Sequence, residues 1–306
     1  MSSKFYASAP GKLILLGEHA VLHGEPAIVC AVNQQIHVTL IPRNDQIITI
    51  DSMLGQHQTT IGKLQIEKPF QFILAVLLHY QQQLPQGFDL RIKSEFSDQV
   101  GFGSSAAVTV ATLKTLQQWL GLPLDRNAFF NASKQIVQQA QGGVGSGLDL
   151  AAAICGGTVY FDPATSEMIP LPHSPPLTVV YSGYKTPTPE VIRSVNERFK
   201  NDTAALQKLC QQMGDLSRQA KSTIEQADWK TTGQLLTQGQ HIMDQLGVND
   251  STLQSIVDKL NQTPGIFGAK ISGSGLGDCV VGIGHADVSF QAPIKVLNVS
   301  IASTNP

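Results

Sequence analysis

Charged residues are scarce in this sequence. Asp, Glu, Lys and Arg make up 14% of its 306 residues, whereas a typical soluble domain contains about 25%. The 21 basic and 23 acidic residues give a formal net charge of −2, and no cluster of Lys and Arg occurs. Because nucleic-acid binding needs concentrated positive charge to neutralise phosphates, we expect no nucleic-acid partner. A small phosphorylated ligand is not excluded, since backbone N–H groups and one lysine can hold it.

Cysteine is also rare. Cys30, Cys155, Cys210 and Cys279 lie far apart in the sequence and form no CxxC pair, which argues against a zinc ribbon or a thioredoxin-like redox site. The apolar run Leu13–Leu16 is too short for the core of a signal peptide. We therefore expect buried, reduced thiols and a cytoplasmic protein.

No hydrophobic run approaches the length of a membrane helix. The longest uncharged apolar run beyond the N-terminal region, Phe72–Leu78, is far shorter than the roughly 20 residues that span a bilayer. We therefore expect no membrane-spanning segment. Hydrophobic residues nevertheless make up 42% of the chain, which predicts a large buried core. The length suits two domains of about 150 residues each.

The predicted elements indicate an α+β fold. Phe5–Lys12 is typical of a strand that runs into a turn at Pro10-Gly11. Strands dominate the first part of the chain and helices come in blocks, which favours α+β over a doubly wound parallel sheet. Further strands are expected over residues 13–16, 27–32, 36–41, 46–50, 89–93, 158–161, 178–182, 278–284 and 294–301, and helices over 70–83, 104–120, 127–139, 189–201, 204–227, 229–246 and 251–263.

A proline-rich segment is the best candidate for a boundary between domains. Pro170–Pro176 holds four prolines in seven residues, and segments of this composition commonly connect domains. We expect one domain over residues 1–172 and a second over residues 173–306.

A segment rich in glycine and serine precedes the best-defined predicted helix. In Val100–Ala107, Gly101 and Gly103 permit positive φ and a close approach of ligand to backbone. The N–H groups of the first helical turn have no intrahelical partner, and the helix dipole places partial positive charge there. These features are typical of a phosphate site, and the hydroxyls of Ser104 and Ser105 could contact phosphate or Mg²⁺. A glycine turn capped by serine is the alternative.

The segment Ser8–Gly24 contains residues suited to catalysis. Lys12 follows the expected Pro-Gly turn and could place a cation near a phosphate. Glu18 and His19 follow a short apolar strand, where the edge of an active site would lie. The alternative for these two residues is a hydrogen-bonded pair within a loop.

Two later segments add a carboxylate and a second glycine-rich loop. Asp149 is a lone carboxylate in the apolar segment Gly145–Ala153, so when buried it must be paired or cap a helix. Its functional interpretation is a general base paired with Lys12. Ala269–Cys279 alternates glycine with other residues and could wrap a phosphate, although a flexible linker has the same composition.

Together and in this order, the four segments resemble those of the GHMP kinase superfamily, and Ser8–Gly24 is most similar to the mevalonate kinases. The resemblance covers most of the chain. It implies a two-lobed fold, with an N-terminal mixed α/β lobe and a C-terminal ferredoxin-like α/β lobe. It also implies ATP- and Mg²⁺-dependent phosphorylation of a small-molecule alcohol. The favoured alcohol is mevalonate, whose conversion to 5-phosphomevalonate belongs to isoprenoid precursor biosynthesis.

The resemblance implies roles for individual residues. Lys12 and Asp149 would be the catalytic pair, with Asp149 accepting the hydroxyl proton and Lys12 stabilising the transferring phosphoryl group. Ser105 would ligate Mg²⁺. The residues implied for ATP binding are Ser94, Gly101, Phe102, Gly103, Ser104, Ser105 and Ala106, and those implied for substrate binding are Glu18, His19, Lys185, Thr188, Gly273 and Ser274.

The sequence departs from the mevalonate kinase pattern at three places. Gln138 stands where these enzymes have a Mg²⁺-ligating Glu, and Glu18 or Asp98 could take its place. Gly142–Gly147 replaces the usual His-Gly-x-Pro-Ser-Gly segment, and Ser97-Asp98 replaces the usual prolines before the phosphate loop. Ala140–Ala153 and the Gly-Asp-Cys279 ending are more similar to phosphomevalonate kinase.

Two other functions therefore stay open. A phosphomevalonate kinase would need additional cations for the substrate phosphate, for which Lys185, Arg193 and Lys270 are candidates. A catalytically inactive protein of the same fold could bind a sugar or nucleotide. The helices expected over residues 189–263 could pack internally or form the face of a homodimer.

Overall fold

The computed structural model describes residues 3–97, 100–122, 125–143 and 145–304. The chain forms two compact units, each assembled from three segments. Unit 1 consists of Met1–Gly11, Gln34–Ser97 and Gly103–Ile154, and unit 2 consists of Lys12–Asn33, Asp98–Phe102 and Cys155–Pro306. A domain boundary at residue 172 stays a prediction.

Two long strands, β1 (Phe5–Leu16) and β2 (Ala27–Pro42), contribute to both units. β1 continues through Pro10 and Gly11, so the expected turn there is wrong. Among the described strands, β1 pairs with β2 alone, and an edge strand tolerates proline because its missing N–H need not join the ladder. β2 is one continuous strand where two were expected, over residues 27–32 and 36–41, because the polar residues between them are also extended.

In unit 1 the strand order is β4-β3-β5-β2. β3 (Ile47–Ser52) pairs antiparallel with β4 (Gly55–Thr60) and parallel with β5 (Phe88–Ser94), and β5 pairs antiparallel with the second half of β2. β4 was not predicted because its sequence, GQHQTT, is polar. Its partner β3 supplies the buried side chains instead, with Ile48 and Ile50 almost fully buried.

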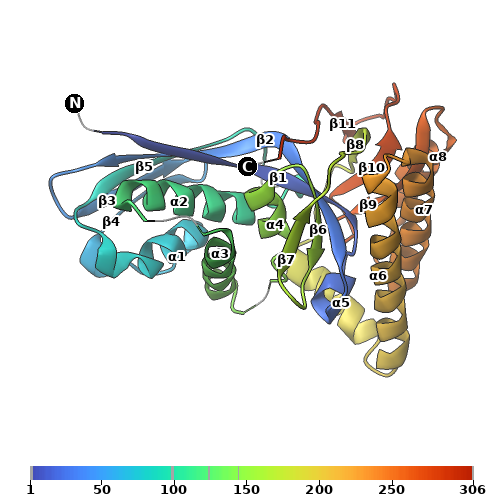
Figure 1. Cartoon of the computed structure of the whole chain (residues 1–306), viewed down its shortest axis with the longest axis horizontal. Coiled ribbons are helices and arrows are strands. Elements are labelled where there is room, and N and C mark those ends of the chain that lie inside the picture. Colours follow the sequence, from blue (N-terminus) through green and yellow to red (C-terminus); the bar gives the residue numbers. More distant parts are fainter. Residues whose placement is uncertain (1–2, 98–99, 123–124, 144, 305–306) are drawn as a thin grey trace. The chain divides into compact units, whose positions relative to one another are not determined.

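Helices cover one face of these strands in unit 1 (Figure 1). α2 has the predicted bounds: it follows Gly103 and ends before Gly121, and both glycines have positive φ. The apolar side of α2 is buried, and Leu113 and Leu116 on this side are completely inaccessible to solvent. The helical elements of this part of the chain are η2 (Ile61–Lys63), α1 (Gln71–His79), η3 (Gln81–Gln83), α2 (Ser104–Leu120), α3 (Arg126–Ala140) and α4 (Leu148–Cys155).

Unit 2 contains strands of two kinds. The first half of β2 pairs antiparallel with β6 (Thr158–Asp162), which pairs in turn with β7 (Glu167–Pro170). A separate antiparallel sheet has the order β11-β8-β10-β9. Its strands are β8 (Leu177–Tyr181), β9 (Ile266–Ser272), β10 (Cys279–Gly284) and β11 (Lys295–Leu297).

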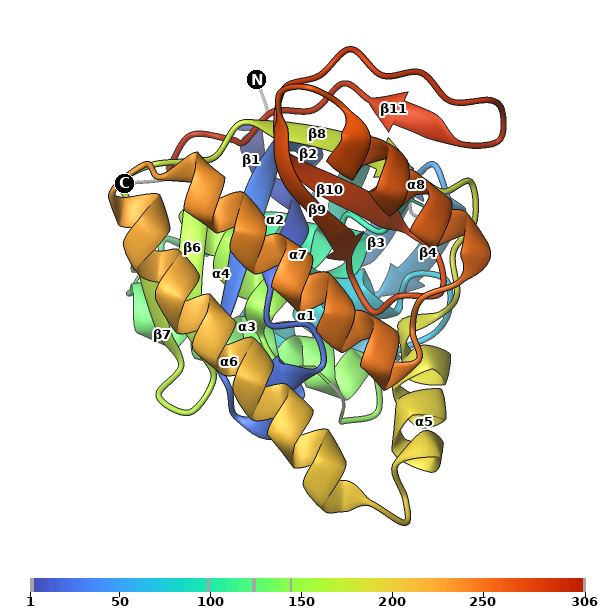
Figure 2. The same cartoon turned by 90° about the vertical axis from the view of Figure 1, so that its right-hand side faces the viewer.

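Helices α7 and α8 lie against β9 and β10, and α6 packs along α7 (Figure 2). α7 and β9 approach each other so closely that a Cβ on Gly268 of β9 would overlap the carbonyl oxygen of Gly233 of α7. Both positions therefore suit glycine. An aspartate side chain caps the N-terminus of each of these three helices. The helical elements of unit 2 are η1 (Ala20–His23), α5 (Thr188–Arg198), α6 (Thr203–Glu225), α7 (Trp229–Leu246) and α8 (Ser251–Gln262).

The α+β fold class is confirmed. All four cysteines are free and buried, as expected. In the part of the chain that the structure describes, no helix has both the length and the apolar content needed to cross a membrane.

Candidate active site

Lys12 and the start of the predicted phosphate loop lie together in unit 2. The backbone N–H of Lys12 donates to the carbonyl of Phe102 over 2.8 Å. Its Nζ donates to the carbonyl of Gly101 over 3.2 Å. Lys12 is 7% exposed, and a buried ammonium needs such acceptors. β1 thereby carries a cation to the glycine-rich loop.

Gly101 contacts a residue that sequence reasoning did not assign to the site, Asp278. Gly101 has a φ of 76°, and a Cβ at this position would lie 2.6 Å from Cγ of Asp278. Both conformation and space therefore require glycine. Asp278 is 5% exposed and has positive φ. An acidic residue within an otherwise uncharged glycine-rich loop is the sequence signal that could have identified it.

The second half of the phosphate loop forms the N-terminus of α2 in unit 1. Gly103 has a φ of 69°, and its carbonyl accepts hydrogen bonds from the N–H groups of Ala106 and Ala107. Ser104 and Ser105, which begin the helix, are half-buried. Their N–H groups have no intrahelical partner and lie at the positive end of the helix dipole. This helix terminus fits a phosphate group.

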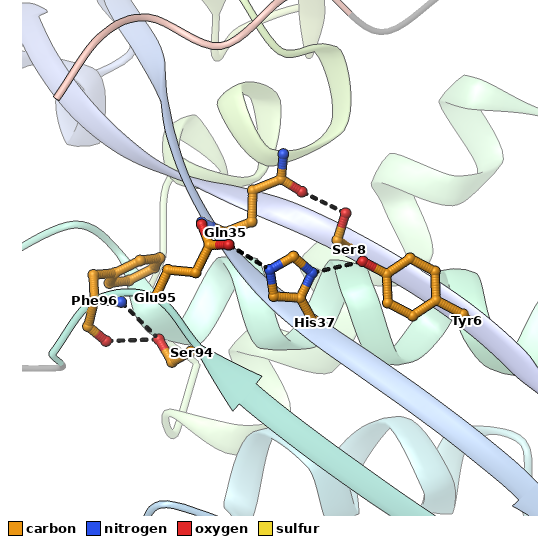
Figure 3. Close-up of polar contacts among 7 residues, drawn as sticks. All are labelled: Tyr6, Ser8, Gln35, His37, Ser94, Glu95 and Phe96. Atoms are coloured by element: carbon orange, nitrogen blue, oxygen red, sulfur yellow. Dashed lines mark hydrogen bonds and ion pairs between the residues drawn. The ribbon is translucent and has the colours of Figure 1, made fainter.

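Ser94 ends β5, and its hydroxyl stabilises the turn that follows. It donates to the carbonyl of Phe96 over 2.6 Å and accepts from the N–H of Phe96 (Figure 3). The ATP-binding role implied for Ser94 stays a prediction. Next to it, Glu95 contacts His37 over 2.8 Å, and this hydrogen bond holds the pKa of Glu95 below its usual value. The turn after β5 is thus anchored to β2. On the other side of the His37 ring, the hydroxyl of Tyr6 lies 2.6 Å from Nδ1 (Figure 3).

Glu18 forms a buried ion pair with Lys270 in unit 2. Lys270 Nζ lies 2.5 Å from Oε1 of Glu18, and the two side chains are 0% and 1% exposed. Burial raises the pKa of Glu18 and lowers that of Lys270, while the attraction between the two charges opposes both shifts. Sequence reasoning placed Glu18 in the site but did not identify Lys270 as its partner.

His19 joins the same loop to the second glycine-rich segment. Its Nε2 lies 2.8 Å from the carbonyl oxygen of Ser274. Burial is the main reason that the pKa of His19 is lowered. His19 also has a φ of 58°, a conformation that is costly for a residue with a side chain and that clusters at functional sites. The implied substrate residues Glu18, His19, Gly273 and Ser274 therefore lie in one region of unit 2.

The loop that carries Lys185 is also attached to the second glycine-rich segment. The N–H of Asp278 donates to the carbonyl of Tyr184 over 2.9 Å, and the hydroxyl of Thr186 donates to the carbonyl of Leu276 over 2.5 Å. Lys185 itself is exposed, as is Thr188 at the start of α5.

The charges of Lys12 and Lys185 both act on the thiol of Cys279. Burial, followed by the charge of Asp278, raises the pKa of this thiol, and the charges of Lys12 and Lys185 oppose that shift. Both lysines therefore lie close enough to Cys279 to act on its charge. Unit 2 thus gathers positive charge beside the glycine-rich segments, which suits a phosphorylated ligand.

Asp149 lies in the first turn of α4 in unit 1 and is half-buried. A carboxylate at this position interacts favourably with the helix dipole. Gln138 contacts the loop before α4: its carbonyl accepts from the N–H of Gly143 over 2.7 Å, and its side-chain amide lies 3.5 Å from the carbonyl of Gly145. The residue that replaces the usual glutamate thus stabilises the loop leading to Asp149.

The described residues contain no group of three or more His, Cys, Asp or Glu side chains that could hold a metal ion. Glu18, one expected substitute for the missing glutamate, is engaged by Lys270. Asp98, the other, lies outside the described residues. The hydroxyl of Ser105 at the start of α2 remains a potential Mg²⁺ ligand. This set suits an ion held mainly by nucleotide phosphates and water, which is common for Mg²⁺.

Comparisons with known proteins identify the family of this chain. The family model for the GHMP kinases N terminal domain matches residues 71–157, and the model for the GHMP kinases C terminal domain matches residues 220–291. A mevalonate kinase from Pyrococcus horikoshii is 28% identical over 294 residues, which cover 90% of this chain and 87% of the relative.

Solved structures share the fold. The crystal structure of Methanococcus jannaschii mevalonate kinase has a TM-score of 0.81 at 19% identity, covering 98% of this chain and 99% of that one. Streptococcus pneumoniae phosphomevalonate kinase, solved with phosphomevalonate and AMPPNP, has a TM-score of 0.77 at 17% identity, covering 97% and 99%. The chain belongs to the GHMP kinase family. It is a small-molecule kinase, and its family supports ATP as the cosubstrate.

Proposed function

We propose that this kinase transfers the γ-phosphoryl group of ATP, in the presence of Mg²⁺, to the 5-hydroxyl of mevalonate. Relatives that carry the name mevalonate kinase support this proposal, since they match 90% and 97% of the chain at 28% and 27% identity. The similarity of Ser8–Gly24 to the same enzymes agrees with them.

The observation that carries the choice of mevalonate over phosphomevalonate is the partner of Lys270. A phosphorylated substrate would need extra cations, and Lys270 was one of three candidates. Its charge is neutralised by Glu18 in a pair that is fully buried. Arg193 is exposed on α5, and Lys185 is the remaining candidate near Cys279. An unphosphorylated alcohol needs no additional cation for binding, so it fits the few cations of this site better than phosphomevalonate does.

The proposed mechanism assigns one task to each residue. The Gly101–Ser105 loop binds the nucleotide phosphates through backbone N–H groups. Asp149 accepts the proton of the substrate hydroxyl. Lys12 stabilises the negative charge of the transferring phosphoryl group. Glu18, His19, Lys185, Thr188, Gly273 and Ser274 are the residues proposed to bind the alcohol.

Mg²⁺ would neutralise charge on the nucleotide phosphates, as it does in other phosphoryl transfers. We propose the Ser105 hydroxyl as its protein ligand. Ser105 is at the start of α2, where its backbone N–H also faces the phosphate site. The same residue would therefore contact both the phosphate and the ion.

Release of ADP by the purified protein tests the proposal. Mevalonate and phosphomevalonate are supplied in parallel with Mg²⁺ and ATP, and a reaction without alcohol measures background hydrolysis. We expect turnover with mevalonate and background rates with phosphomevalonate. Turnover with phosphomevalonate alone, or with neither alcohol, would contradict the proposal.

Phosphomevalonate kinase is the second candidate, and Asp278 is the observation that favours it. The Gly-Asp-Cys279 ending is similar to phosphomevalonate kinases, and Asp278 lies against Gly101 of the phosphate loop. The same assay distinguishes the two candidates, because the order of rates with the two substrates would be reversed. Background rates with both would favour a binding protein of this fold.

A further inference from the structure

Lys270 reaches Glu18 through space that α7 leaves open. It lies within β9, opposite Val281 of β10, and its side chain passes Gly239 of α7. A Cβ on Gly239 would lie 2.9 Å from Cδ of Lys270 and 2.7 Å from Cδ2 of Leu16. Any larger residue at 239 would therefore block the path of the lysine stem.

The ammonium group has defined acceptors at the end of this path. It donates to Oε1 of Glu18 over 2.5 Å and to the backbone carbonyl of Ile271. Next along β9, the N–H of Ile271 donates to Oε1 of Gln240 over 2.9 Å, and Gln240 is itself buried. Both α7 and β9 thus fix the position of the charge.

A pair of this kind is not explained by stability. Removing two charges from water costs several kcal/mol per ion, and hydrophobic replacements for buried pairs are often neutral or stabilising. The role of the Glu18–Lys270 pair is therefore sought in its effect on the carboxylate of Glu18 rather than in the stability of the fold. Its effect is to fix the buried carboxylate of Glu18 in one position.

The other oxygen of Glu18, Oε2, is buried and has no hydrogen-bond partner among the described residues, and the same holds for the hydroxyl oxygen of Ser274. The backbone N–H groups of Glu18 and Gly273 lie near enough to the carboxylate to lower its pKa. His19 connects the two residues, since it follows Glu18 and contacts the carbonyl of Ser274. Buried polar atoms are rarely left unpaired in native proteins. Each of these two atoms can accept a hydrogen bond from a hydroxyl group of a ligand.

We propose that Lys270 is a positioning residue that orients Glu18, so that Oε2 accepts a hydrogen bond from a hydroxyl of the alcohol substrate. This inference rests on the proposed function, because it takes the ligand of this region to be an alcohol. It assigns Lys270 no contact with the substrate. The substrate hydroxyl completes the hydrogen bonding of a carboxylate that the lysine has already placed.

Three variants test the inference: Lys270→Met, Glu18→Gln, and the two changes combined. Lys270→Met keeps the volume of the lysine stem but leaves a buried carboxylate without its counter-ion, so Glu18 should take up a proton. We expect the KM for the alcohol to rise about tenfold or more, the value of a hydrogen bond to a charged group. The KM for ATP should change little, because Lys270 is not in the phosphate loop.

The pH profile separates positioning from a merely structural role. In the wild type, the charge of Lys270 opposes the burial that raises the pKa of Glu18, so the KM for the alcohol should depend less on pH than in Lys270→Met. In Lys270→Met, protonated Glu18 should make this KM depend on pH, with recovery as the pH rises. The combined variant has no group to titrate, so its profile should be flat and its stability partly restored.

Arg218→Met is the matched control. Arg218 pairs with Glu25 over 2.6 Å and is half exposed, and Glu25 lies just after η1 in the same N-terminal loop that carries Glu18. Because Arg218 is half exposed, loss of this pair should change stability less than loss of the fully buried one. The KM for the alcohol and its pH profile should match those of the wild type.

Infrared difference spectra against Glu18→Gln provide a readout that needs no enzyme activity. We expect an ionised carboxylate signal in the wild type and a protonated one in Lys270→Met. An unchanged carboxylate signal in Lys270→Met would overturn the inference, even if no tested alcohol were phosphorylated. An altered signal with an unchanged KM for the alcohol would overturn it as well. Failure of the proposed function would appear separately, as background ADP release by the wild type.

Discussion

Asp149 and Asp125 both lie at the start of a helix in unit 1, but they do different things there. Asp125 is the N-cap of α3, and its carboxylate accepts hydrogen bonds from the N–H groups of Asn127 and Ala128. Asp149 is inside the first turn of α4. Asp125 is therefore a structural cap, whereas Asp149 occupies the first turn of α4, and its proposed role is in the chemistry.

Replacement of Asp149 by Asn should therefore affect chemistry rather than nucleotide binding. An amide oxygen is a poor proton acceptor, so we expect kcat to fall by about 10²–10⁴-fold, the usual contribution of a general base. The KM for ATP should stay close to that of the wild type. Steady-state kinetics and a nucleotide titration measure the two effects.

Asp125→Asn is the control for this variant. Asn is as good an N-cap as Asp, so kcat and the melting temperature should both be retained. Near-normal turnover by Asp149→Asn would contradict the role of Asp149 as the proton acceptor.

Single residues of the site differ in how well the sequence predicts them. Lys12, Gly101, His19 and Ser274 could each be assigned to a site because short motifs carry them, but their contacts with one another could not be predicted. Lys270 could not be predicted as the partner of Glu18, because a lysine in a strand ordinarily indicates a solvent-facing position. Only the glycine at position 239, on a helix 31 residues upstream, makes its burial possible, and no local pattern in the sequence reports that.

At the scale of elements, the two ends of α2 allow a controlled test of the phosphate loop. Gly101 and Gly121 flank the helix, and both have positive φ, 76° and 65°. Alanine at either position should cost stability for its strained backbone. Alanine at Gly101 would also collide with Asp278, whereas a Cβ on Gly121 meets no atom within 4 Å.

We expect Gly101→Ala to raise the KM for ATP at least about tenfold, since a displaced loop loses hydrogen bonds to charged phosphates. Gly121→Ala should lower the melting temperature but leave the KM for ATP unchanged. Kinetics and thermal unfolding of both variants check this. Equal effects of the two substitutions on the KM would show that the contact with Asp278 does not matter.

Helices were predicted better than strands, and the reason is physical. α2 and α7 have the expected bounds because glycine or aspartate marks their ends and apolar residues recur along one side. β4 and β7 were missed, since neither has a run of apolar residues. β1 was divided at Pro10-Gly11, because only its place at the edge of a sheet makes proline acceptable there.

At the scale of the whole molecule, the cysteines report on unfolding. Cys30, Cys155, Cys210 and Cys279 are each at most 2% exposed. Burial raises the pKa of Cys30 to about 12 and is the main cause that raises the pKa of Cys210 to about 11. At pH 8 both thiols are therefore protonated as well as inaccessible, and thiol reagents attack the thiolate.

We expect a thiol reagent to modify none of the four cysteines of the native protein at pH 8 and all four after unfolding in denaturant. The rate of modification should rise with denaturant in step with the loss of secondary structure. A control reaction with free cysteine shows that the reagent is active. Rapid modification of one thiol in the absence of denaturant would reveal a local opening rather than global unfolding.

The way the chain alternates between the two units affects how the protein is made on the ribosome. The last segment of unit 1 ends at Ile154, so that unit can be assembled when half of the chain has been synthesised. The strand that begins unit 2 must wait much longer: the N–H of Asn33 donates to the carbonyl of Ser300, and the carbonyl of Ala31 accepts from the N–H of Ala302. Residues 12–33 therefore leave the ribosome early and stay without these partners until residues 300–302 have been synthesised. Unit 2 can complete its folding only after those residues have left the ribosome.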